Sequence, residues 1–308
     1  MPGDDNDTQC EDGPSPFDLD SIPRSTYIAD GLTRLNADWI TEHISTTVGE
    51  QAYDRAWRAI IPQWLGRLSE ELRGTYRIDE SPEFTILQPA SVERPNRLVD
   101  HAERSRLLAM RFWPGLAIEQ DVFGKHVVIV AESQDDYYDY TSHYYPDGEF
   151  GGSGGMCIRG TGYTHMILNA SAPYVQELAL THEITHALLA QLPLPLWIEE
   201  GMVQIVEENI NQNVVPYINA FEHKAYWSEH TLAGLWLGSA FHEEGPGQSL
   251  AYQLSRHMVF ELAKKDMKRL IAFANEAMQL DAGRAAAIKH LGHSLSGCLP
   301  DFLQIKFD

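Results

Sequence analysis

The spacing of apolar residues predicts that segment 21–77 is helical, with the strongest signal between Glu50 and Leu72. Large apolar side chains return there every three or four positions, as they do along one face of an amphipathic helix. Gly74 is expected to end this helix. The stripe consists of Ala52, Tyr53, Ala56, Trp57, Ile60, Ile61, Trp64, Leu65 and Leu68. We interpret its aromatic residues as core rather than as a binding site.

The pattern changes to short strands between residues 78 and 170. Apolar, β-branched runs bounded by turn residues are typical of strands. The expected strands are 83–87, 126–131, 156–158 and 164–169. A helix from about 92 to 113 should separate the first two and end at Pro114-Gly115, and the last two should pair as a hairpin. His165, on the last strand, is expected to be a surface or rim residue.

Two polar segments of this region are open to more than one interpretation. Residues 135–145 are crowded with tyrosine and acidic residues, which fits a substrate-facing lid and equally fits a helical turn on the surface. Residues 151–155 form a glycine-rich loop. No lysine-bearing transition from strand to helix follows that loop, so it is a poor phosphate-binding site.

From residue 171 onward the pattern is helical. Ser171 is the expected N-cap, and Pro173 suits the first turn of a helix that continues to Leu192. Its apolar residues at helical spacing are Val175, Leu178, Ile184, Leu188 and Leu192. A proline-containing reversal at 192–196 should place the next helix, 199–208, beside the first. Further amphipathic helices are expected at 253–262, 268–280 and 285–291.

The first of these helices carries the candidate chemistry. Residues 182–186 read His-Glu-x-x-His, which on a helix puts His182 and His186 on one face, where both can bind one metal ion. Glu183 then points toward the water that such a metal activates. A catalytic zinc needs a third protein ligand, and Glu200, at the start of the next helix, is the candidate. The alternative is a solvated histidine pair on an ordinary amphipathic helix.

The chain is strongly acidic, with 23 basic and 44 acidic residues, so the formal net charge is 23 − 44 = −21. Seven of the acidic residues and none of the basic ones lie in the first 20 residues, which are also rich in Pro, Gly and Ser. This composition predicts a disordered acidic tail. The remaining net charge, −21 + 7 = −14, argues against nucleic acid or an anionic membrane as the main partner.

The sequence also indicates the cellular compartment in which the protein resides. No apolar run approaches the roughly 18 residues that a membrane span requires, and the start of the chain lacks the basic and apolar regions of a signal peptide. Three cysteines, Cys10, Cys157 and Cys298, are too few and too far apart for a disulfide framework or a metal cluster. We therefore expect a protein of the reducing cytoplasm.

The residues around the metal motif resemble the gluzincins, the zinc metallopeptidases of peptidase clan MA that include thermolysin and the leukotriene hydrolase-type aminopeptidases. The resemblance covers roughly residues 83–307, and thirteen residues separate the His-Glu-x-x-His motif from Glu200. Leu196-Trp-Ile-Glu-Glu-Gly201 is similar to the family's Trp-Leu-x-Glu-Gly. The short spacer is closer to that of compact peptidase-MA-like families. The resemblance implies Glu183 as general base. The zinc ligands that it implies are His182, His186 and Glu200.

The resemblance also bears on the other catalytic groups. Ala251-Tyr-Gln253 is similar to the Tyr-Glu-Lys-Gly of the aminopeptidases, whose tyrosine donates to the oxyanion of the tetrahedral intermediate, which implies that role for Tyr252. His257 is the alternative donor, by analogy with thermolysin. Gly154-Gly-Met-Cys157 is similar to the aminopeptidase Gly-x-Met-Glu-Asn, but Cys157 stands where the family has its amine-binding glutamate. This departure weakens the case for an exopeptidase.

Together these observations predict an α+β, zincin-like fold. A small mixed β-sheet subdomain, 78–170, should supply an edge strand above the site. A mainly helical catalytic subdomain, 171–308, should carry the third ligand, with the zinc site in the cleft between the two. The tail, 1–20, and the helical segment, 21–77, precede them.

The expected function is zinc-dependent hydrolysis of a peptide bond in a peptide or protein substrate. Glu183 would act as base, and Tyr252 or His257 would stabilise the oxyanion. One alternative is a zinc-binding regulatory protein that keeps the scaffold with weak or no catalysis. Another is a zinc hydrolase of a non-peptide substrate. A base next to the first histidine favours catalysis, because a structural zinc needs none, and structural sites are usually rich in cysteine.

Overall fold

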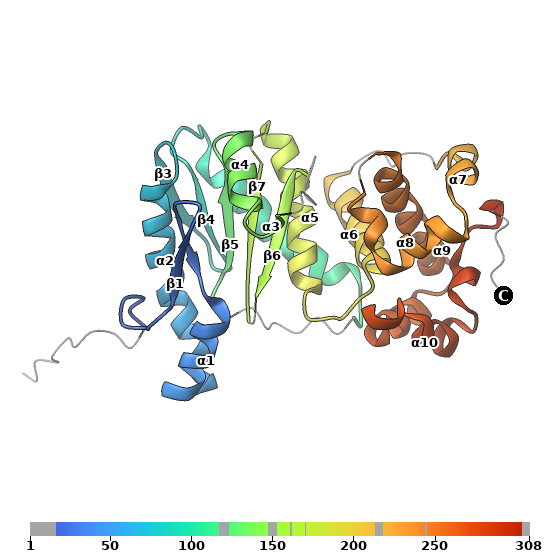
Figure 1. Ribbon diagram of the computed structural model, residues 1–308, viewed down its shortest axis with the longest axis horizontal. Coiled ribbons are helices and arrows are strands. Elements are labelled where there is room, and N and C mark those ends of the chain that lie inside the picture. Colours follow the sequence, from blue (N-terminus) through green and yellow to red (C-terminus); the bar gives the residue numbers. More distant parts are fainter. Residues whose placement is uncertain are drawn as a thin grey trace, which may run out of the picture.

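The computed structural model describes residues 17–116, 123–146, 153–160, 162–169, 171–212, 218–243 and 245–303 of the 308-residue chain. These residues form a mixed α+β structure, as the sequence predicted. A sheet-containing part and a helical part lie side by side along the longest axis (Figure 1). Helices α5 (Pro173–Leu189) and α6 (Leu196–Asn211) lie where the two parts meet.

A five-stranded mixed sheet forms the centre of the first part. Its strands are β3 (Tyr76–Glu80), β4 (Phe84–Pro89), β5 (His126–Val130), β6 (Gly155–Gly160) and β7 (Tyr163–Leu168). In the order β3-β4-β5-β7-β6, the two inner pairs are parallel and the two outer pairs antiparallel. The four predicted strands, the β6–β7 hairpin and the edge position of β6 are confirmed. The sequence did not reveal β3, because this mostly polar edge strand carries no apolar pattern.

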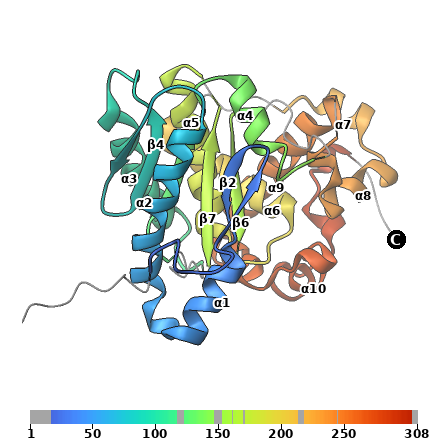
Figure 2. The same cartoon turned by 60° about the vertical axis from the view of Figure 1, so that its left-hand side comes forward.

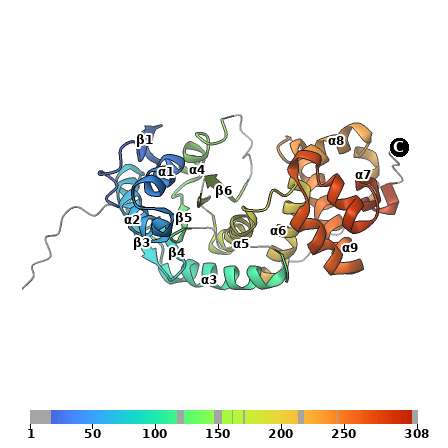
Figure 3. The ribbon, with the colours of Figure 1, turned by 90° about the horizontal axis from the view of Figure 1, so that it is seen from below.

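Alternation of side chains along the inner strands supplies two hydrophobic cores. On β5, Val128 and Val130 belong to one core, whereas Val127 and Ile129 belong to the other. The first core also contains residues of α3 (Pro95–Phe112), α5, α6 and α9 (Pro246–Glu276). The second contains residues of α1 (Ala37–Thr47), α2 (Tyr53–Glu71) and α4 (Gln134–Thr141). Figure 3 shows α3 running from the sheet toward α6. Helices therefore cover both faces of the sheet, and its inner strands are buried throughout.

The N-terminal segment is only partly helical, so the expectation of helix throughout 21–77 is wrong. The predicted amphipathic helix is present as α2, and α1 precedes it. Before them, β1 (Thr26–Ala29) and β2 (Leu32–Leu35) pair as an antiparallel hairpin. Asp30 and Gly31 both have positive φ at the turn, a conformation for which Asp-Gly is favoured in two-residue hairpins. The hairpin could therefore have been predicted from the Asp-Gly pair in the sequence.

The sequence placed the start of the folded region at residue 21, but residues 17–20 already belong to it. Residues 1–16 of the expected acidic tail lie outside the described part of the chain. Phe17 and Leu19 are buried in the second core, and the backbone N–H of Leu19 donates to the Gln63 side chain on α2 at 2.9 Å. Two apolar side chains among the acidic residues therefore attach 17–20 to the fold.

The first part of the tyrosine-rich segment 135–145 belongs to helix α4, and two residues that follow the helix, Tyr144 and Tyr145, line the cavity described below. Ser133 caps this helix by accepting from the backbone N–H of Asp136. Tyr137 and Tyr140 are fully buried against the sheet. The helical interpretation of the segment is therefore confirmed, although the helix contributes to the core instead of lying loosely on the surface.

The second part is helical, as predicted, with different boundaries. α9 joins two of the expected helices, and Asp266 breaks it between them with φ −162° and ψ 94°. The shorter helices are α7 (Ala220–Tyr226), α8 (Glu229–Leu237) and α10 (Arg284–Ala286). After α10 a π-helical turn continues to Leu291, where Gly292 ends it with positive φ. Among the described residues, no helix has both the length and the apolar character needed to cross a membrane.

Helices α6 and α9 approach each other closely at Gly201 on α6. A Cβ atom at Gly201 would lie 2.5 Å from Val259 Cγ2 and 2.6 Å from the Ser255 carbonyl oxygen, both on α9. Such separations are shorter than van der Waals contact, so only glycine allows this approach. On the preceding turn, the buried indole N–H of Trp197 donates to the Ala282 carbonyl at 3.1 Å. The Trp-x-x-x-Gly spacing of this segment therefore has a packing role, which fixes α6 against the C-terminal helices.

Replacing Gly201 with alanine should destabilise the protein. The added methyl group forces α6 and α9 apart, and overpacking of this kind costs about 1–3 kcal/mol, which lowers Tm by several degrees. Denaturant unfolding and calorimetry measure both effects. Gly66→Ala is the matched control, because Gly66 lies inside α2 with no atom within 4 Å of its added Cβ. That control should gain up to about 1 kcal/mol; equal losses for the two variants would contradict the packing role.

Candidate metal centre

Helix α5 presents the His-Glu-x-x-His residues at the junction of the two parts of the fold. Pro173 occupies its first turn as expected, but the cap is Ala172, which makes no side-chain cap bond. The expectation that Ser171 caps the helix is therefore wrong. On the face toward the sheet, Leu180 and Ile184 are buried in the first core. This anchoring turns the histidine-bearing face of α5 toward α6.

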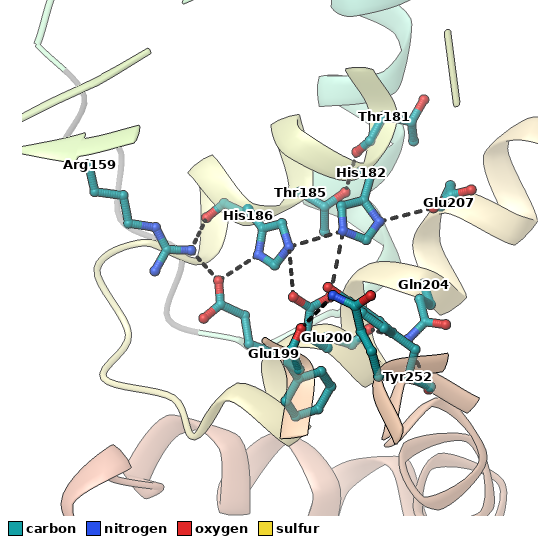
Figure 4. Close-up of polar contacts among 12 residues, drawn as sticks. Arg159, Thr181, His182, Thr185, His186, Glu199, Glu200, Gln204, Glu207 and Tyr252 are labelled. Atoms are coloured by element: carbon teal, nitrogen blue, oxygen red, sulfur yellow. Dashed lines mark hydrogen bonds and ion pairs between the residues drawn. The ribbon is translucent and has the colours of Figure 1, made fainter. Parts of the chain in front are cut away.

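Helix α6 begins at Leu196, three residues before the expected start, and carries Glu200 into contact with both histidines. His182 Nε2 lies 3.1 Å from His186 Nε2 and 3.6 Å from Glu200 Oε2. His186 Nε2 lies 3.5 Å from Glu200 Oε1. One ligand atom from each of the three residues falls within 4.8 Å of the other two. Figure 4 shows the three side chains converging from α5 and α6.

These three residues fit the ligand set of a divalent transition metal. Two imidazole nitrogens and a carboxylate oxygen are the donors of a common catalytic zinc site. Ligand atoms about 2.0–2.1 Å from a tetrahedral ion lie about 3.3 Å apart, close to the separations seen here. Glu200 Oε2 is buried and has no hydrogen-bond partner among the described residues. An ion held by His182, His186 and Glu200 would bind this carboxylate oxygen.

Each histidine is held by a second carboxylate on its other ring nitrogen (Figure 4). His182 Nδ1 lies 3.0 Å from Glu207 Oε2, and His186 Nδ1 lies 2.7 Å from Glu199 Oε1. Such contacts fix the tautomer that leaves Nε2 free as a ligand, and they increase its basicity. The sequence analysis did not assign these roles to Glu199 and Glu207. The spacing of Glu207, two helical turns after Glu200 on the same face of α6, was the signal that could have found it.

Arg159 links the edge strand to this cluster. Its Nη2 donates to Glu199 and, at 3.2 Å, to the His186 carbonyl oxygen. The carboxylate of Glu199 therefore bridges a guanidinium and an imidazole. Because Arg159 lies on β6 and His186 on α5, these bonds fix the sheet and the histidine-bearing helix to each other at the site.

The electrostatic field of the cluster favours a cation. Burial by itself lowers the pKa of His182, but its close contact with Glu200 and its hydrogen bond with Glu207 outweigh burial and raise that pKa well above the usual value. Burial likewise opposes ionisation of Glu200, yet the charge of His186 and the contacts with both imidazoles lower its pKa. The carboxylates surround the imidazoles with more negative charge than Arg159 balances. The same field that favours protons on the imidazoles attracts a metal ion.

The cluster lies in a cavity of about 870 Å³ between the sheet and the helices. β6, α5, α6 and the start of α9 all contribute lining residues, so the site lies in the cleft where the sequence placed it. Glu183 lines this cavity, and burial raises the pKa of its carboxyl group. A Cβ atom at Gly155 would lie 3.0 Å from Glu183 Cγ. The missing side chain on β6 thus leaves room for Glu183 beside the metal ligands.

Tyr252 reaches the same cavity from α9. Burial, followed by the charges of Glu200 and Glu183, raises the pKa of its phenol, so the hydroxyl keeps its proton and can donate. Gln204 fixes the backbone around it by donating to the Tyr252 carbonyl at 3.0 Å. The ring packs edge-on against Phe241, with centroids 5.2 Å apart. The structure therefore brings Tyr252 to the candidate ligands, as the sequence predicted.

His257, the alternative donor, is not among the residues that line the cavity. Its ring packs against Phe302, with centroids 6.1 Å apart. It lies five positions after Tyr252 on one helix, which rotates its side chain by about 140° relative to the tyrosine. His165 is also not a ligand. It is buried rather than on the rim, with Nε2 2.8 Å from the Tyr140 hydroxyl.

Cys157 lines the cavity from β6, at the position where the resemblance implies a glutamate. Burial raises the pKa of its thiol to about 12, so the group is neutral near pH 7. A neutral thiol supplies no negative charge for a substrate amino group. The structure therefore gives no counterpart at this position to the amine-binding carboxylate.

Comparison with protein-family models finds no match for this sequence, and comparison with curated proteins finds none either. The functional interpretation therefore depends on the residues and geometry of this site.

We expect the protein to bind about one zinc ion per chain, because a single set of ligands converges here. Glu200→Gln should weaken binding by more than roughly a hundredfold, whereas Glu199→Gln and Glu207→Gln should weaken it by about 10–100-fold, the range for residues that orient a ligand. Glu208→Gln is the control, since Glu208 pairs with Arg256 instead of a histidine. Competition with a chromogenic chelator measures the affinities. A greater loss for Glu199→Gln than for Glu200→Gln would reassign the third ligand.

Proposed function

We propose that this protein is a zinc-dependent metallopeptidase of the gluzincin type, with a zincin-like fold, which hydrolyses peptide bonds. One observation carries the proposal: His182, His186 and Glu200 converge beside Glu183 in a large cavity. Two histidines and a carboxylate leave a fourth position open on a tetrahedral ion, which is typical of catalytic sites. Structural zinc sites are closed and usually contain cysteine.

His182, His186 and Glu200 would hold the zinc ion, with Glu207 and Glu199 orienting the two imidazoles. When bound, zinc would lower the pKa of water and polarise the carbonyl group of the substrate. With both imidazoles neutral, the charge of the surrounding carboxylates exceeds that of Arg159, which supports a dication at this position. Binding of the ion would also favour the deprotonated imidazoles that act as ligands.

Glu183 is proposed to accept the proton of the attacking water and to pass it to the leaving amine. Glu183 directly follows His182 in the sequence. It lines the cavity, so it lies on the side where substrate would bind. Burial raises its pKa, which brings it closer to the pH at which a general base is effective. Gly155 leaves the space that this side chain occupies.

Tyr252 is proposed to stabilise the negative charge that develops on the carbonyl oxygen of the substrate. Its protonated hydroxyl is a donor within the same cavity and lies near Glu200. A donor that is already oriented needs little reorganisation when this charge appears. Two contacts support that orientation: Gln204 donates to the Tyr252 carbonyl, and the Tyr252 ring packs edge-on against Phe241.

The size and composition of the cavity favour hydrolysis over a purely regulatory role. A cavity of about 870 Å³ falls in the range that binds ligands, and a base lies beside the candidate ligands. A zinc-binding regulatory protein needs neither feature. The edge position of β6 along one wall supports a peptide over other substrates, because an extended chain can pair with a free strand edge.

Glu183→Gln should leave zinc bound and the fold intact but lower kcat by roughly 10²–10⁴-fold, because glutamine keeps the shape and cannot accept a proton. Turnover of a quenched-fluorescent peptide library, measured with matched zinc content, tests this. Glu177→Gln on the same helix is the control, since Glu177 pairs with Arg97 outside the cavity. A Glu183→Gln variant with near wild-type turnover would exclude Glu183 as the base. A wild-type protein that cleaves no peptide would exclude the proposed function.

Tyr252→Phe should lower kcat by roughly a hundredfold with little change in KM, because its bond forms chiefly in the transition state. His257→Ala, on the same helix but outside the cavity, should leave kcat unchanged. Tyr226→Phe controls for the loss of a phenol elsewhere. If Tyr252→Phe lowers thermal stability while kcat per folded molecule stays constant, Tyr252 has only a packing role.

A further inference from the structure

A second cavity, which we call the arginine pocket, lies where α3 and α5 are in contact (Figure 2). Its volume is about 590 Å³, which is within the range that binds small ligands. None of its lining residues lines the cavity of the metal centre. The arginine pocket is therefore a separate candidate site. Its principal lining residues are Arg94, Arg97, Asp100, His101, Arg104 and Glu177.

The three arginines and His101 recur along one side of α3, starting at its N-cap, Arg94. Positions 94, 97, 101 and 104 follow one another at intervals of three, four and three, which is the spacing of one helical face. Arg94, Arg97 and Arg104 are all exposed, so a dissolved ligand can reach their guanidinium groups. A guanidinium group offers paired donors that match the oxygens of a phosphate or a carboxylate. This side of α3 is therefore suited to an anion.

Two of these arginines have no anionic partner. Arg97 donates to Glu177 from Nε at 2.6 Å and from Nη2 at 3.0 Å, so its charge is compensated. Arg94 and Arg104 form no ion pair among the described residues. Three arginines against the carboxylates of Asp100 and Glu177 leave the lining with a net charge of +1. This local excess of positive charge contrasts with the formal net charge of −21 for the whole chain.

His101 has one ring nitrogen left for a ligand. The residue is 5% exposed and lines the arginine pocket. Its Nε2 lies 2.9 Å from the Glu177 carbonyl oxygen, which can only accept, so Nε2 carries the proton of this bond. Nδ1 makes no hydrogen bond with the described residues and retains accessible surface. An anion beside Nδ1 would favour the protonated ring, which donates from both nitrogens.

The start of α3 adds to the positive potential of the arginine pocket. No side chain caps this 18-residue helix, and no acidic residue lies in its first turn. The N-terminus of a helix carries a partial positive charge, and its free backbone N–H groups favour phosphate and other anions. This effect acts beside Arg94 and Arg97, where the guanidinium groups already attract the same kind of ligand.

The unpaired groups favour a phosphate over a carboxylate. A carboxylate carries one charge and pairs with one guanidinium group, as Glu177 does with Arg97. Two further guanidinium groups and one imidazole nitrogen require a ligand with more charge and more acceptor atoms. A phosphate monoester carries about −1.5 to −2 charges and three acceptor oxygens, which match this set.

We propose that the arginine pocket binds a small ligand through a phosphate group. Arg94 and Arg104 compensate its charge, and His101 Nδ1 donates to one of its oxygens. The acidity of the whole chain opposes a long polyanion, whereas a small ligand interacts mainly with charges within about 8 Å. This site does not depend on the proposed peptidase function, and its occupancy is tested without turnover.

Isothermal titration calorimetry of the full chain with glycerol 3-phosphate is the direct test. Arg94→Gln and Arg104→Gln should each weaken binding by roughly tenfold, the effect of losing one charged hydrogen bond. Asp100→Asn should strengthen binding, because it removes an opposing charge. Arg111→Gln is the matched control, since Arg111 lies on the same helix outside the arginine pocket, and it should bind like the wild type. Absence of binding, or an affinity unchanged in both arginine variants, would overturn the site.

Two further ligands identify the chemistry that is recognised. Inorganic phosphate that binds as tightly as the ester supports a site for free phosphate, whereas weaker binding supports an organic phosphate. Acetate should bind at least tenfold more weakly than either, because it pairs with one guanidinium group only. Equal affinities for acetate and glycerol 3-phosphate would overturn the assignment of a phosphate.

Removal of the metal separates the arginine pocket from the metal centre, since phosphate is also a ligand for zinc. Binding that persists after chelation and in Glu200→Gln supports the arginine pocket. Binding that is lost in both assigns the phosphate to the metal ion and overturns the site. Phosphate binding without hydrolysis of any peptide supports the pocket and overturns the peptidase. Hydrolysis without phosphate binding supports the peptidase and overturns the pocket.

Discussion

The candidate site depends on the contact between α5 and α6, which sets two buried imidazoles against a group of carboxylates. His182 lies between Glu200 and Glu207, and His186 lies between Glu200 and Glu199. Buried charges are tolerated only where opposite charges and hydrogen bonds compensate for lost hydration. When the imidazoles are neutral, as metal ligands are, the charge of Glu199, Glu200 and Glu207 exceeds that of Arg159, so the contact favours additional positive charge. A divalent metal at the three converging ligand atoms would supply it.

The rest of the fold holds these two helices in place. The sheet fixes α5 through the first core, and α9 fixes α6 at Gly201, where a side chain would not fit. Arg159 then ties the edge strand to both, since it bonds to Glu199 and to the His186 carbonyl. The site therefore lies where the two parts of the molecule meet. A change in the packing of either part would alter the distances among the three converging side chains.

Strand β6 joins the sheet to the candidate site at two positions. Its first residue, Gly155, leaves space for Glu183. Further along, Arg159 bonds to Glu199, which contacts His186. The edge strand therefore helps to position both carboxylates, although it supplies none of the three converging side chains.

The sequence by itself determined what short-range spacing controls. Helical periodicity fixed α2 and α5, and the four-residue interval placed His182 and His186 on one face. The Glu200 assignment followed from a local motif, and the geometry brings that residue to the histidines. Only the tertiary structure decided which groups meet across elements: the carboxylates on the outer ring nitrogens, and the packing of His257 against Phe302 instead of along the cavity. Those contacts depend on how helices and strands rotate and approach one another, and periodicity along one chain does not specify either.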